Sequence, residues 1–409
     1  MRKMFLALFC GFIFACSDSN QAHLQQGIWL MELEVMDKEV LPFNFRLSRS
    51  EEGNYTMEIY NAEETITVDE IRITRDSIIM RPPVFQGYMA GKFSANRIEG
   101  QFIKEDLDRI VPFTAIHGVK KRFRQSSASI ENVSGIWETE FSQGTEDSYM
   151  AKGIFRQSGD KVNGTFRTTT GDYRYLEGVV TADSLKVSAF DGAHAFLFTG
   201  KVTDSTLVGT FYSGNHFKEP FVARRNEAFE LPDADSLTFL KEGYDRLTFS
   251  FPDADGNMIS LQDERFKDKV TLVQIMGTWC PNCLDETKFY VDYLRNNPGK
   301  DIEVVALAFE YAKTKEGAFE SISRLKERIK VDYPVLLAQF GTSDKKRAQE
   351  KLPMLNHVLS YPTTIYVDKK GVVRKIHTGF NGPATGDKHQ EFKEEFNEFV
   401  QSLLEEETK

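Results

Sequence analysis

Two stretches of this chain repeat each other, and the repeat limits the possible folds more than any other feature of the sequence. Gly27-Ile-Trp returns as Gly135-Ile-Trp, and further matching pairs follow in the same order at an offset of 107 to 110 residues. These pairs are Phe45 and Phe155, Asp76 and Asp183, Gly91 and Gly200, Gly100 and Gly209, and Pro112 and Pro220. Matches that keep their order and spacing over such a length indicate a tandem duplication of one module.

The residue pattern of both copies indicates β structure. Short runs such as 29–35 and 54–60 alternate apolar and polar residues, and turn residues separate them. The Gly-x-Trp motif near the start of each copy resembles lipocalin-like barrels, in which a tryptophan closes one end. We therefore expect two tandem all-β modules of the barrel or sandwich type, at residues 27–124 and 134–226, joined by a linker at 125–133.

A different pattern begins after the second copy. An apolar, β-branched run at 270–276 leads through Trp279 to two cysteines, Cys280 and Cys283. The run predicts a buried strand, and the first cysteine would then lie at the N-terminus of the following helix. Unpaired backbone N–H groups and the helix dipole favour a thiolate there, and a thiolate beside a second thiol can attack a disulfide.

The rest of the chain alternates strand and helix. Strands are expected at 271–276, 302–309 and 335–338, helices at 281–294, 319–329 and 392–403, and a closing hairpin at 363–367 and 372–376. Before them we expect an acidic linker at 227–247 and a hairpin with its turn at Asp255-Gly256. The order strand, CxxC, helix, strand, helix, strand, hairpin, helix is that of a thioredoxin fold. Residues 248–409 are therefore expected to form an α/β thioredoxin-like domain.

Three motifs in this region resemble the TlpA/ResA family of membrane-tethered thiol-disulfide oxidoreductases. They are Phe251-Pro-Asp-x-x-Gly, the stretch Trp279-Cys-Pro-Asn-Cys-x-x-Glu286, and Tyr361-Pro-Thr. The resemblance covers residues 249–409 and none of the β repeats. It implies a dithiol–disulfide cycle in which Cys280 is the exposed nucleophile and Cys283 is the buried resolving thiol.

The same resemblance assigns roles to the residues around the dithiol. Pro362 would be a cis proline facing the two cysteines, and the backbone of Tyr361 would pair with an incoming peptide. Glu286 would exchange a proton with the resolving thiol, and Trp279 and Pro281 would complete the substrate-binding surface. Two of these assignments have simpler alternatives, an ordinary trans proline at a strand start and an exposed glutamate that stabilises the helix dipole.

One departure from plain thioredoxin concerns proton transfer. Thioredoxin has a buried aspartate six residues before its first cysteine, and Gln274 occupies that position here. An amide cannot take up a proton, so proton transfer would fall to Glu286 or to water. The pair Pro281-Asn282 also replaces the Gly-Pro of a strongly reducing thioredoxin. The direction of electron flow therefore stays open, with reduction of disulfides favoured over oxidation.

The first residues are typical of a bacterial lipoprotein signal peptide. A basic start and a short apolar run end at Ile13-Phe-Ala-Cys16, which resembles a lipobox. Removal of residues 1–15 would leave Cys16 as the lipidated first residue, followed by a polar tether at 16–26. Ordinary cleavage and a retained anchor are the alternatives.

The cysteine count indicates that the remaining pair is chemical. Of four cysteines, Cys10 would leave with the signal peptide and Cys16 would carry lipid, so the CxxC pair alone would remain as protein thiols. A zinc site would need a second pair of ligands, and an inert disulfide would be the one staple of a long secreted chain. We expect neither, and we expect no metal and no cofactor. A net charge of −10 also argues against nucleic acid as a partner.

Together these patterns predict an envelope-tethered, periplasm-facing thiol-disulfide oxidoreductase that most simply reduces protein disulfides. Its expected partners are disulfide-containing envelope proteins, a membrane thiol donor that regenerates the dithiol, and the membrane that holds the lipid. The outer membrane is favoured because Ser17 follows Cys16. One alternative is a ligand- or partner-binding β-repeat lipoprotein with an accessory redox domain, instead of repeats that act as a spacer or docking platform. Another is a peroxiredoxin-like thiol peroxidase, although the Pro-x-x-x-Thr-x-x-Cys context of that class is missing.

Overall fold

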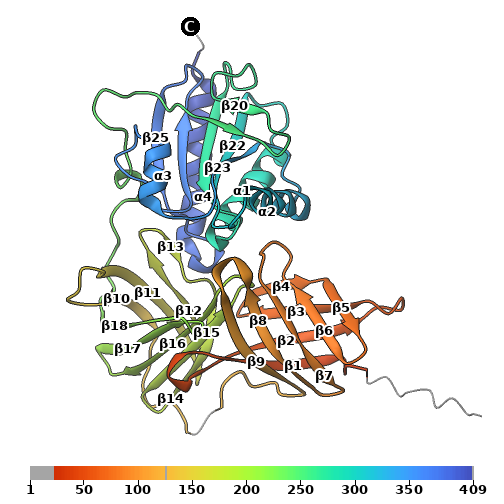
Figure 1. Cartoon of the computed structure of the whole chain (residues 1–409). Coiled ribbons are helices and arrows are strands. Elements are labelled where there is room, and N and C mark those ends of the chain that lie inside the picture. The colour runs from red at the N-terminus through yellow and green to blue at the C-terminus, as the bar shows by residue number, and fades with distance from the viewer. Residues whose placement is uncertain (1–22, 125–126, 408–409) are drawn as a thin grey trace, which may run out of the picture.

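The computed structural model describes residues 23–124 and 127–407, so the expected signal peptide and Cys16 lie outside the described residues. The described chain forms two nine-stranded sheets followed by an α/β unit (Figure 1). The two sheets lie side by side, and the α/β unit rests on the β part of the molecule. This arrangement brings segments that are far apart in the sequence against the α/β unit.

The first sheet is an antiparallel meander whose chain returns to its start. Its strands are β1 (Gly27–Glu34), β2 (Val40–Arg49), β3 (Tyr55–Asn61), β4 (Glu64–Val68), β5 (Glu70–Thr74), β6 (Ser77–Arg81), β7 (Tyr88–Ser94), β8 (Arg97–Lys104) and β9 (Arg109–His117), with short 3-10 turns η1 (Met36–Lys38) and η2 (Glu105–Leu107). Their order is β4-β3-β2-β1-β9-β8-β7-β6-β5, so the first and last strands pair. Alternate side chains, among them Met31, Phe43 and Phe45, fill a common core.

The second sheet repeats this course and closes on itself. Its strands are β10 (Gly135–Phe141), β11 (Tyr149–Ser158), β12 (Lys161–Thr168), β13 (Gly171–Asp172), β14 (Leu176–Thr181), β15 (Ser184–Phe190), β16 (Ala195–Val202), β17 (Thr206–Ser213) and β18 (Phe217–Arg225). The order is β11-β10-β18-β17-β16-β15-β14-β12-β13, and β11 also pairs with β12. This extra pairing gives a barrel whose core is rich in phenylalanine, including Phe141, Phe166 and Phe198.

Corresponding strands occupy corresponding places in the two sheets. β1 lies between β2 and β9, and β10 lies between β11 and β18. Trp29 and Trp137 are fully buried in these strands. Each indole Nε1 donates to the carbonyl four residues earlier, that of Gln25 at 3.0 Å and that of Val133 at 2.8 Å. The two tryptophans therefore have the same role, since each holds the segment that precedes its strand.

Residues 23–26, expected to form the end of a polar tether, pack against the first sheet instead. Leu24 is 3% exposed and belongs to the core of that sheet. The backbone N–H of Gln25 donates to the carbonyl of Ala95 at 2.9 Å. Burying a leucine stabilises the folded chain by about 1.5–3 kcal/mol, which favours packing of this segment over a free tether.

The α/β unit has a five-stranded sheet in the order β23-β22-β21-β24-β25. Its elements are β19 (Ser250–Pro252), β20 (Met258–Ser260), β21 (Val270–Met276), α1 (Pro281–Asn296), β22 (Ile302–Phe309), α2 (Lys315–Ile329), β23 (Val335–Gln339), α3 (Lys345–Lys351), β24 (Thr363–Val367), β25 (Val373–Thr378), η4 (Pro383–Thr385) and α4 (Asp387–Glu405). β21, β22 and β23 run parallel, and β24 and β25 run antiparallel to their neighbours. The expected thioredoxin-like order of elements is confirmed.

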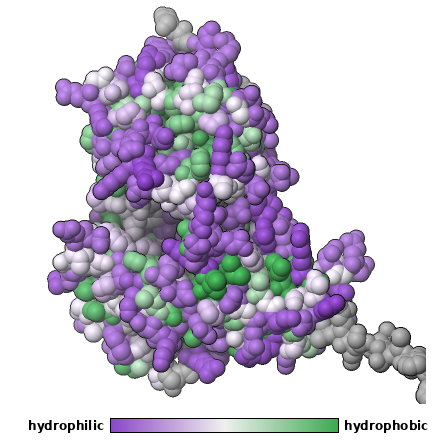
Figure 2. Space-filling view, viewed as in Figure 1, coloured by the Kyte–Doolittle hydropathy of each residue, from purple (hydrophilic) through white to green (hydrophobic). Residues whose placement is uncertain are grey.

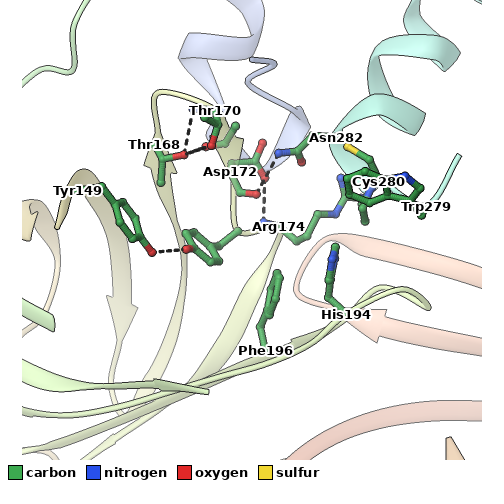
Figure 3. A pocket seen from close by; sticks show the side chains of 13 residues that line it. Tyr149, Thr168, Thr170, Asp172, Arg174, His194, Phe196, Trp279, Cys280 and Asn282 are labelled. Atoms are coloured by element: carbon green, nitrogen blue, oxygen red, sulfur yellow. Dashed lines mark hydrogen bonds between the residues drawn. The ribbon is translucent and has the colours of Figure 1, made fainter. Parts of the chain in front are cut away.

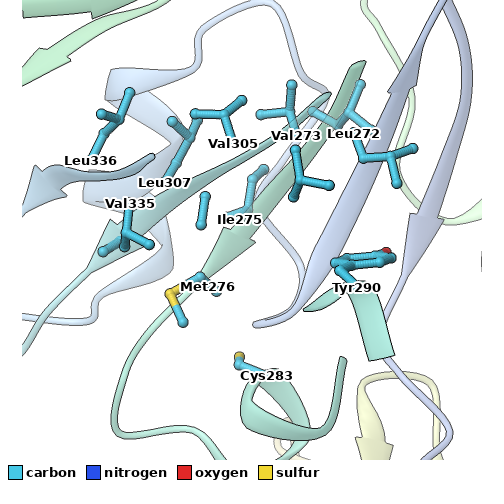
Figure 4. Packing of buried hydrophobic residues seen from close by; sticks show 14 of the residues in the cluster. Leu272, Val273, Ile275, Met276, Cys283, Tyr290, Val305, Leu307, Val335 and Leu336 are labelled. Carbon is cyan, nitrogen blue, oxygen red and sulfur yellow. The ribbon is translucent and has the colours of Figure 1, made fainter. Parts of the chain in front are cut away.

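The core of the α/β unit forms around the central strand, β21, every residue of which is buried. Leu272, Ile275 and Tyr290 belong to this core, and Cys283 is part of the same cluster (Figure 4). Helix α3 was not expected from the sequence. Its seven residues are mainly charged and only Ala348 is buried, so no apolar period marks it.

The segment 227–247, expected as a linker, lies along the α/β unit. It contains the short turn η3 (Ala234–Ser236), and Asp235 contacts His377 Nδ1 at 2.7 Å. Further along, Leu240 forms a backbone bridge with Leu355.

The face shown in Figure 2 is mainly hydrophilic with small hydrophobic patches. Within the described residues, no helix is both long enough and apolar enough to span a membrane.

Candidate active site

The first cysteine of the CxxC pair caps a helix. Cys280 is the N-cap of α1, and its Sγ accepts a hydrogen bond from the backbone N–H of Cys283 at 3.2 Å. The same sulfur donates to the carbonyl of Tyr361 at 3.4 Å. Pro281 occupies the first turn of the helix, where its missing N–H costs no hydrogen bond. The geometry places the Cys280 sulfur where backbone donors and the helix dipole can stabilise negative charge.

The second cysteine lies behind the first, inside the α/β core. Cys283 has no exposed surface. Burial raises the pKa of the Cys283 thiol, and the nearby Cys280 sulfur acts in the same direction. The structure therefore brings the two expected thiols together and distinguishes them, because the buried one needs a proton acceptor before it can attack.

A buried carboxyl group lies in the same part of the core. Glu286 has no exposed surface, so the alternative of an exposed first-turn acid is wrong. It accepts hydrogen bonds from Gln274 Nε2 at 2.8 Å, Thr364 Oγ1 at 3.0 Å and the Tyr290 hydroxyl at 3.1 Å. Burial raises the pKa of Glu286 to about 7. Gln274 Nε2 also reaches the carbonyl of Cys283 at 3.4 Å, so the residue that replaces the thioredoxin aspartate joins Glu286 to the resolving cysteine.

The loop before β24 forms one side of the dithiol. The peptide bond between Tyr361 and Pro362 is cis. The ring of Tyr361 meets the indole of Trp279 edge-on at a centroid distance of 5.6 Å, and Trp279 Nε1 donates to the carbonyl of Phe309 at 2.9 Å. Trp279 is thus fixed beside Cys280, as a substrate-binding residue would need to be.

A second buried acid, Glu310, was not singled out from the sequence. Its carboxylate accepts the backbone N–H and the hydroxyl of Thr278, both at 2.8 Å. Burial raises the pKa of Glu310 to about 7. These bonds fix the turn that leads into Cys280. The one sequence signal was its position, because Glu310 directly follows the buried strand β22.

The expected exposure of Cys280 is wrong, because the second sheet covers it. Cys280 is only 6% exposed. The covering residues are 168–174, named here the cover segment, which runs from the end of β12 through β13. The carbonyl of Asp172 accepts Asn282 Nδ2 at 3.3 Å, and the carbonyl of Thr170 accepts Ser360 Oγ at 2.9 Å. The cover segment therefore contacts both the CxxC turn and the loop before β24.

Charged side chains attach the cover segment to the other units. Arg174 forms a buried ion pair with Asp285 of α1 and a second one with Glu64 of the first sheet at 2.5 Å. Asp172 Oδ2 accepts the backbone N–H of Gly382 at 2.7 Å. Burial raises the pKa of Asp172 to about 6. No motif marks these residues, since their partners lie far away in the sequence.

A cavity of about 260 Å³ lies between the second sheet and the dithiol (Figure 3). Tyr149, Tyr173 and Phe196 line it from the barrel, and Trp279 and Cys280 line it from the α/β unit. Pro281 also borders the cavity, as expected of a substrate-binding residue, whereas Tyr361 does not. In residues 23–124 and 127–407, no group of three or more His, Cys, Asp or Glu side chains could hold a metal ion.

Comparisons with known proteins identify the family of the C-terminal region. Residues 241–392 match the Redoxin family. The chain is also 30% identical over 140 residues to thioredoxin-like protein YneN of Bacillus subtilis (strain 168), which covers 34% of this chain and 73% of that relative. The C-terminal region is therefore a thioredoxin-fold oxidoreductase segment. Through it the chain belongs to the Redoxin family, as a relative of YneN, and the resemblance expected from the motifs is confirmed.

Solved structures similar to this region include two bacterial proteins. One is a thiol-disulfide oxidoreductase from Bacteroides fragilis NCTC 9343, at 18% identity, 36% coverage of this chain, 99% coverage of that chain and a TM-score of 0.27. The other is a thiol:disulfide interchange protein of the thioredoxin family from Chlorobium tepidum TLS, at 19% identity, 40% and 98% coverage and a TM-score of 0.29.

Proposed function

We propose that this chain is a thiol-disulfide oxidoreductase that works through a cycle between the Cys280–Cys283 dithiol and its disulfide. The observation that carries the proposal is the difference between the two sulfurs. Cys280 caps α1 and borders the cavity, whereas Cys283 is fully buried behind it. This is the arrangement that an attacking thiol and a resolving thiol require.

The cycle consists of two successive thiol-disulfide exchanges. The Cys280 thiolate attacks one sulfur of a substrate disulfide, a mixed disulfide forms, and the first substrate thiolate leaves. Cys283 then loses its proton and attacks the Cys280 sulfur, which releases the second substrate thiolate. The substrate gains two electrons and the protein retains a Cys280–Cys283 disulfide. An external thiol donor then has to reduce that disulfide.

Glu286 is proposed as the group that accepts the proton of Cys283. Its pKa of about 7 suits a group that exchanges protons near neutral pH. The hydrogen bonds from Gln274 to both Glu286 and the Cys283 carbonyl support this assignment. Gln274 cannot carry the proton itself, so its role is to position the carboxyl group.

The cellular setting is proposed from the N-terminal sequence and the family resemblance. The lipobox at Cys16 supports a lipid anchor in the bacterial envelope, with the dithiol facing the periplasm. The expected substrates there are protein disulfides, and a membrane thiol donor would complete the cycle. We also propose that the two barrel-like sheets arose by tandem duplication, a proposal supported by the matching strand positions and by the equivalent bonds of Trp29 and Trp137.

Turnover of the full chain tests the proposed cycle. With dithiothreitol as reductant and insulin as substrate, the unchanged chain is expected to accelerate reduction, and Cys280→Ser is expected to abolish the acceleration. In a second experiment the reduced Cys283→Ser chain, freed of dithiothreitol, should attack insulin but not release it, so a mixed disulfide at Cys280 should accumulate and be visible by mass spectrometry. Unchanged turnover in Cys280→Ser would contradict the proposal. The reduction potential of the pair would then set the preferred direction of electron flow.

A further inference from the structure

The second sheet covers the face of the α/β unit where a protein substrate would dock. The loop that contains the cis Tyr361–Pro362 bond lies between Ser360 and β24. Ser360 is bonded to the carbonyl of Thr170 at 2.9 Å, and the backbone N–H of Gly379 donates to the carbonyl of Pro362 at 2.9 Å. A methyl group at Gly379 would lie 2.9 Å from the carbonyl oxygen of Thr169. The cover segment thus contacts Ser360, which precedes the cis bond, and lies beside Gly379, which follows β25 and bonds to Pro362.

The cover segment is also packed against the dithiol turn itself. Gly171 has a φ of +142° and lies against Asn282, the residue between Pro281 and Cys283. A methyl group at Gly171 would collide with the Asn282 amide. Because the backbone of Gly171 packs directly against the Asn282 side chain, a folded protein surface has no room to approach Cys280 while the cover segment stays in place.

Buried charges hold the cover segment in this position. The Arg174 guanidinium lies among the carboxylates of Asp285 and Glu64, and the Asp172 carboxylate accepts the Gly382 backbone N–H. Arg174, Asp172 and Asp285 are all buried. Loss of the Arg174 charge would leave carboxylates from three different units facing one another, and their repulsion would push the cover segment away from α1.

The remaining space beside Cys280 is small, and aromatic and polar side chains share its lining. Its volume of about 260 Å³ lies just below the usual range for small-molecule sites, which begins at about 300 Å³. The hydroxyl groups of the barrel wall are already occupied, since those of Tyr149 and Tyr173 lie 2.6 Å apart and Tyr149 donates to Glu219 at 2.7 Å. The barrel wall therefore offers ring surface, to which Phe196 contributes, and the charged side chains of Asp172 and Arg174 add polar groups to the lining.

We propose that the cover segment selects the substrate of this site by size, admitting low-molecular-weight disulfides and keeping folded proteins away from Cys280. The proposal rests on the thiol-disulfide exchange proposed above, and it replaces the protein disulfides expected there with small disulfides as the favoured substrates, so that a protein such as insulin is reduced slowly. The chemistry is unchanged. Cys280 forms a mixed disulfide with one half of the small molecule and releases the other half as a thiolate, and Cys283 then displaces the first half.

Labelling of Cys280 measures access without relying on turnover. The reduced full chain is treated with N-ethylmaleimide, or with a maleimide that carries a polyethylene glycol chain of several kilodaltons, and labelling of the Cys280 peptide is followed by mass spectrometry. Reduced glutathione, treated in the same way, gives the ratio of the two rates for an unobstructed thiol. The ratio of the N-ethylmaleimide rate to the rate of the large maleimide is expected to be about tenfold higher at Cys280 than at glutathione. The large reagent can react with Cys280 only after local opening of the structure. An equal ratio at both thiols would overturn the proposal without any variant.

Variants of the charged contacts test the role of the cover segment. Arg174→Gln and Asp285→Asn are expected to bring the labelling ratio of Cys280 close to that of glutathione, since both remove the ion pair between the cover segment and α1. Arg97→Gln is the control, because its ion pair with Glu99 lies on the exposed surface of the first sheet. A folded Arg174→Gln or Asp285→Asn chain with the ratio of the unchanged protein would contradict the proposal.

Single turnovers separate this proposal from the proposed function. The reduced full chain, freed of other thiols, is mixed with dithiodipyridine or with insulin. We expect the unchanged chain to reduce dithiodipyridine rapidly. We expect insulin reduction to become about tenfold faster in the Arg174→Gln and Asp285→Asn variants. If the unchanged chain reduced insulin as fast as the variants do, the proposed substrate selection would be overturned, but the redox function would stay intact. Failure to reduce either compound would instead refute the redox function.

Discussion

Replacing Glu286 with glutamine is expected to stabilise the α/β unit at alkaline pH and to change little in acid. The carboxyl group is fully buried, and burial raises its pKa from 4.5 to about 7. Folding therefore favours the protonated form, so the folded state loses stability as pH rises from 4.5 to 7, and the loss is complete above pH 7. The difference between these two pKa values corresponds to about 3 kcal/mol in the free energy of unfolding.

The replacement keeps the local hydrogen bonds. A glutamine at this position can accept from the Gln274 amide with its oxygen, and its amide can donate to the hydroxyl groups of Tyr290 and Thr364, which are free to rotate. The variant removes the charge alone. The pH dependence that remains in it comes in part from Glu310, whose pKa burial also raises to about 7.

Urea unfolding, followed by hydrogen exchange of peptides from β21, measures the stability of the α/β unit. At about pH 8 the Glu286→Gln chain should exceed the unchanged chain by about 3 kcal/mol, and at about pH 4 the two should agree within about 1 kcal/mol. Glu395→Gln is the control, because Glu395 lies on the exposed face of α4. If the two chains differed by the same amount at both pH values, the buried carboxyl could not be the cause.

Three further changes test other parts of the structure. Phe198→Ala is expected to lower the free energy of unfolding of the second sheet by about 3–5 kcal/mol, measured by urea titration, because it empties a fully buried site. Asn61→Leu removes a buried amide that pairs with the backbone of β15 across the two sheets, and a loss of about 1–3 kcal/mol should appear as faster hydrogen exchange in β15. Gly171→Ala should collide with Asn282 and speed labelling of the CxxC pair by a bulky maleimide, whereas Gly144→Ala, also at positive φ but in open space, should not.

Much of the fold follows from local pattern in the sequence. Alternating runs predicted the strands of the two sheets, and apolar periodicity predicted α1, α2 and α4. Helix α3 escaped because it is short and charged. The packing of Leu24 was not predicted, because a single apolar residue in a polar segment gives no periodic pattern.

The candidate site was predictable where a motif carries it. Cys280, Cys283 and Glu286 lie close together, and Gln274 joins the last two, because all of them belong to one strand and the helix that follows it. The cover segment was not predictable in this way. Asp172 contacts Asn282 and Gly382 of the α/β unit, both more than a hundred positions away, and no spacing within the sequence encodes such contacts.

The cover segment gives the β repeats a role other than that of a spacer. A spacer would hold the α/β unit at a distance from the membrane and would leave its dithiol as open as in an isolated domain. Here Arg174 joins both sheets to α1, and Tyr149 and Phe196 of the second sheet line the space beside Cys280. In the proposed cycle, residues of the α/β unit determine reactivity, and the cover segment proposed to control access lies outside that unit. Removing the repeats should therefore alter which disulfides react much more than whether a disulfide can react.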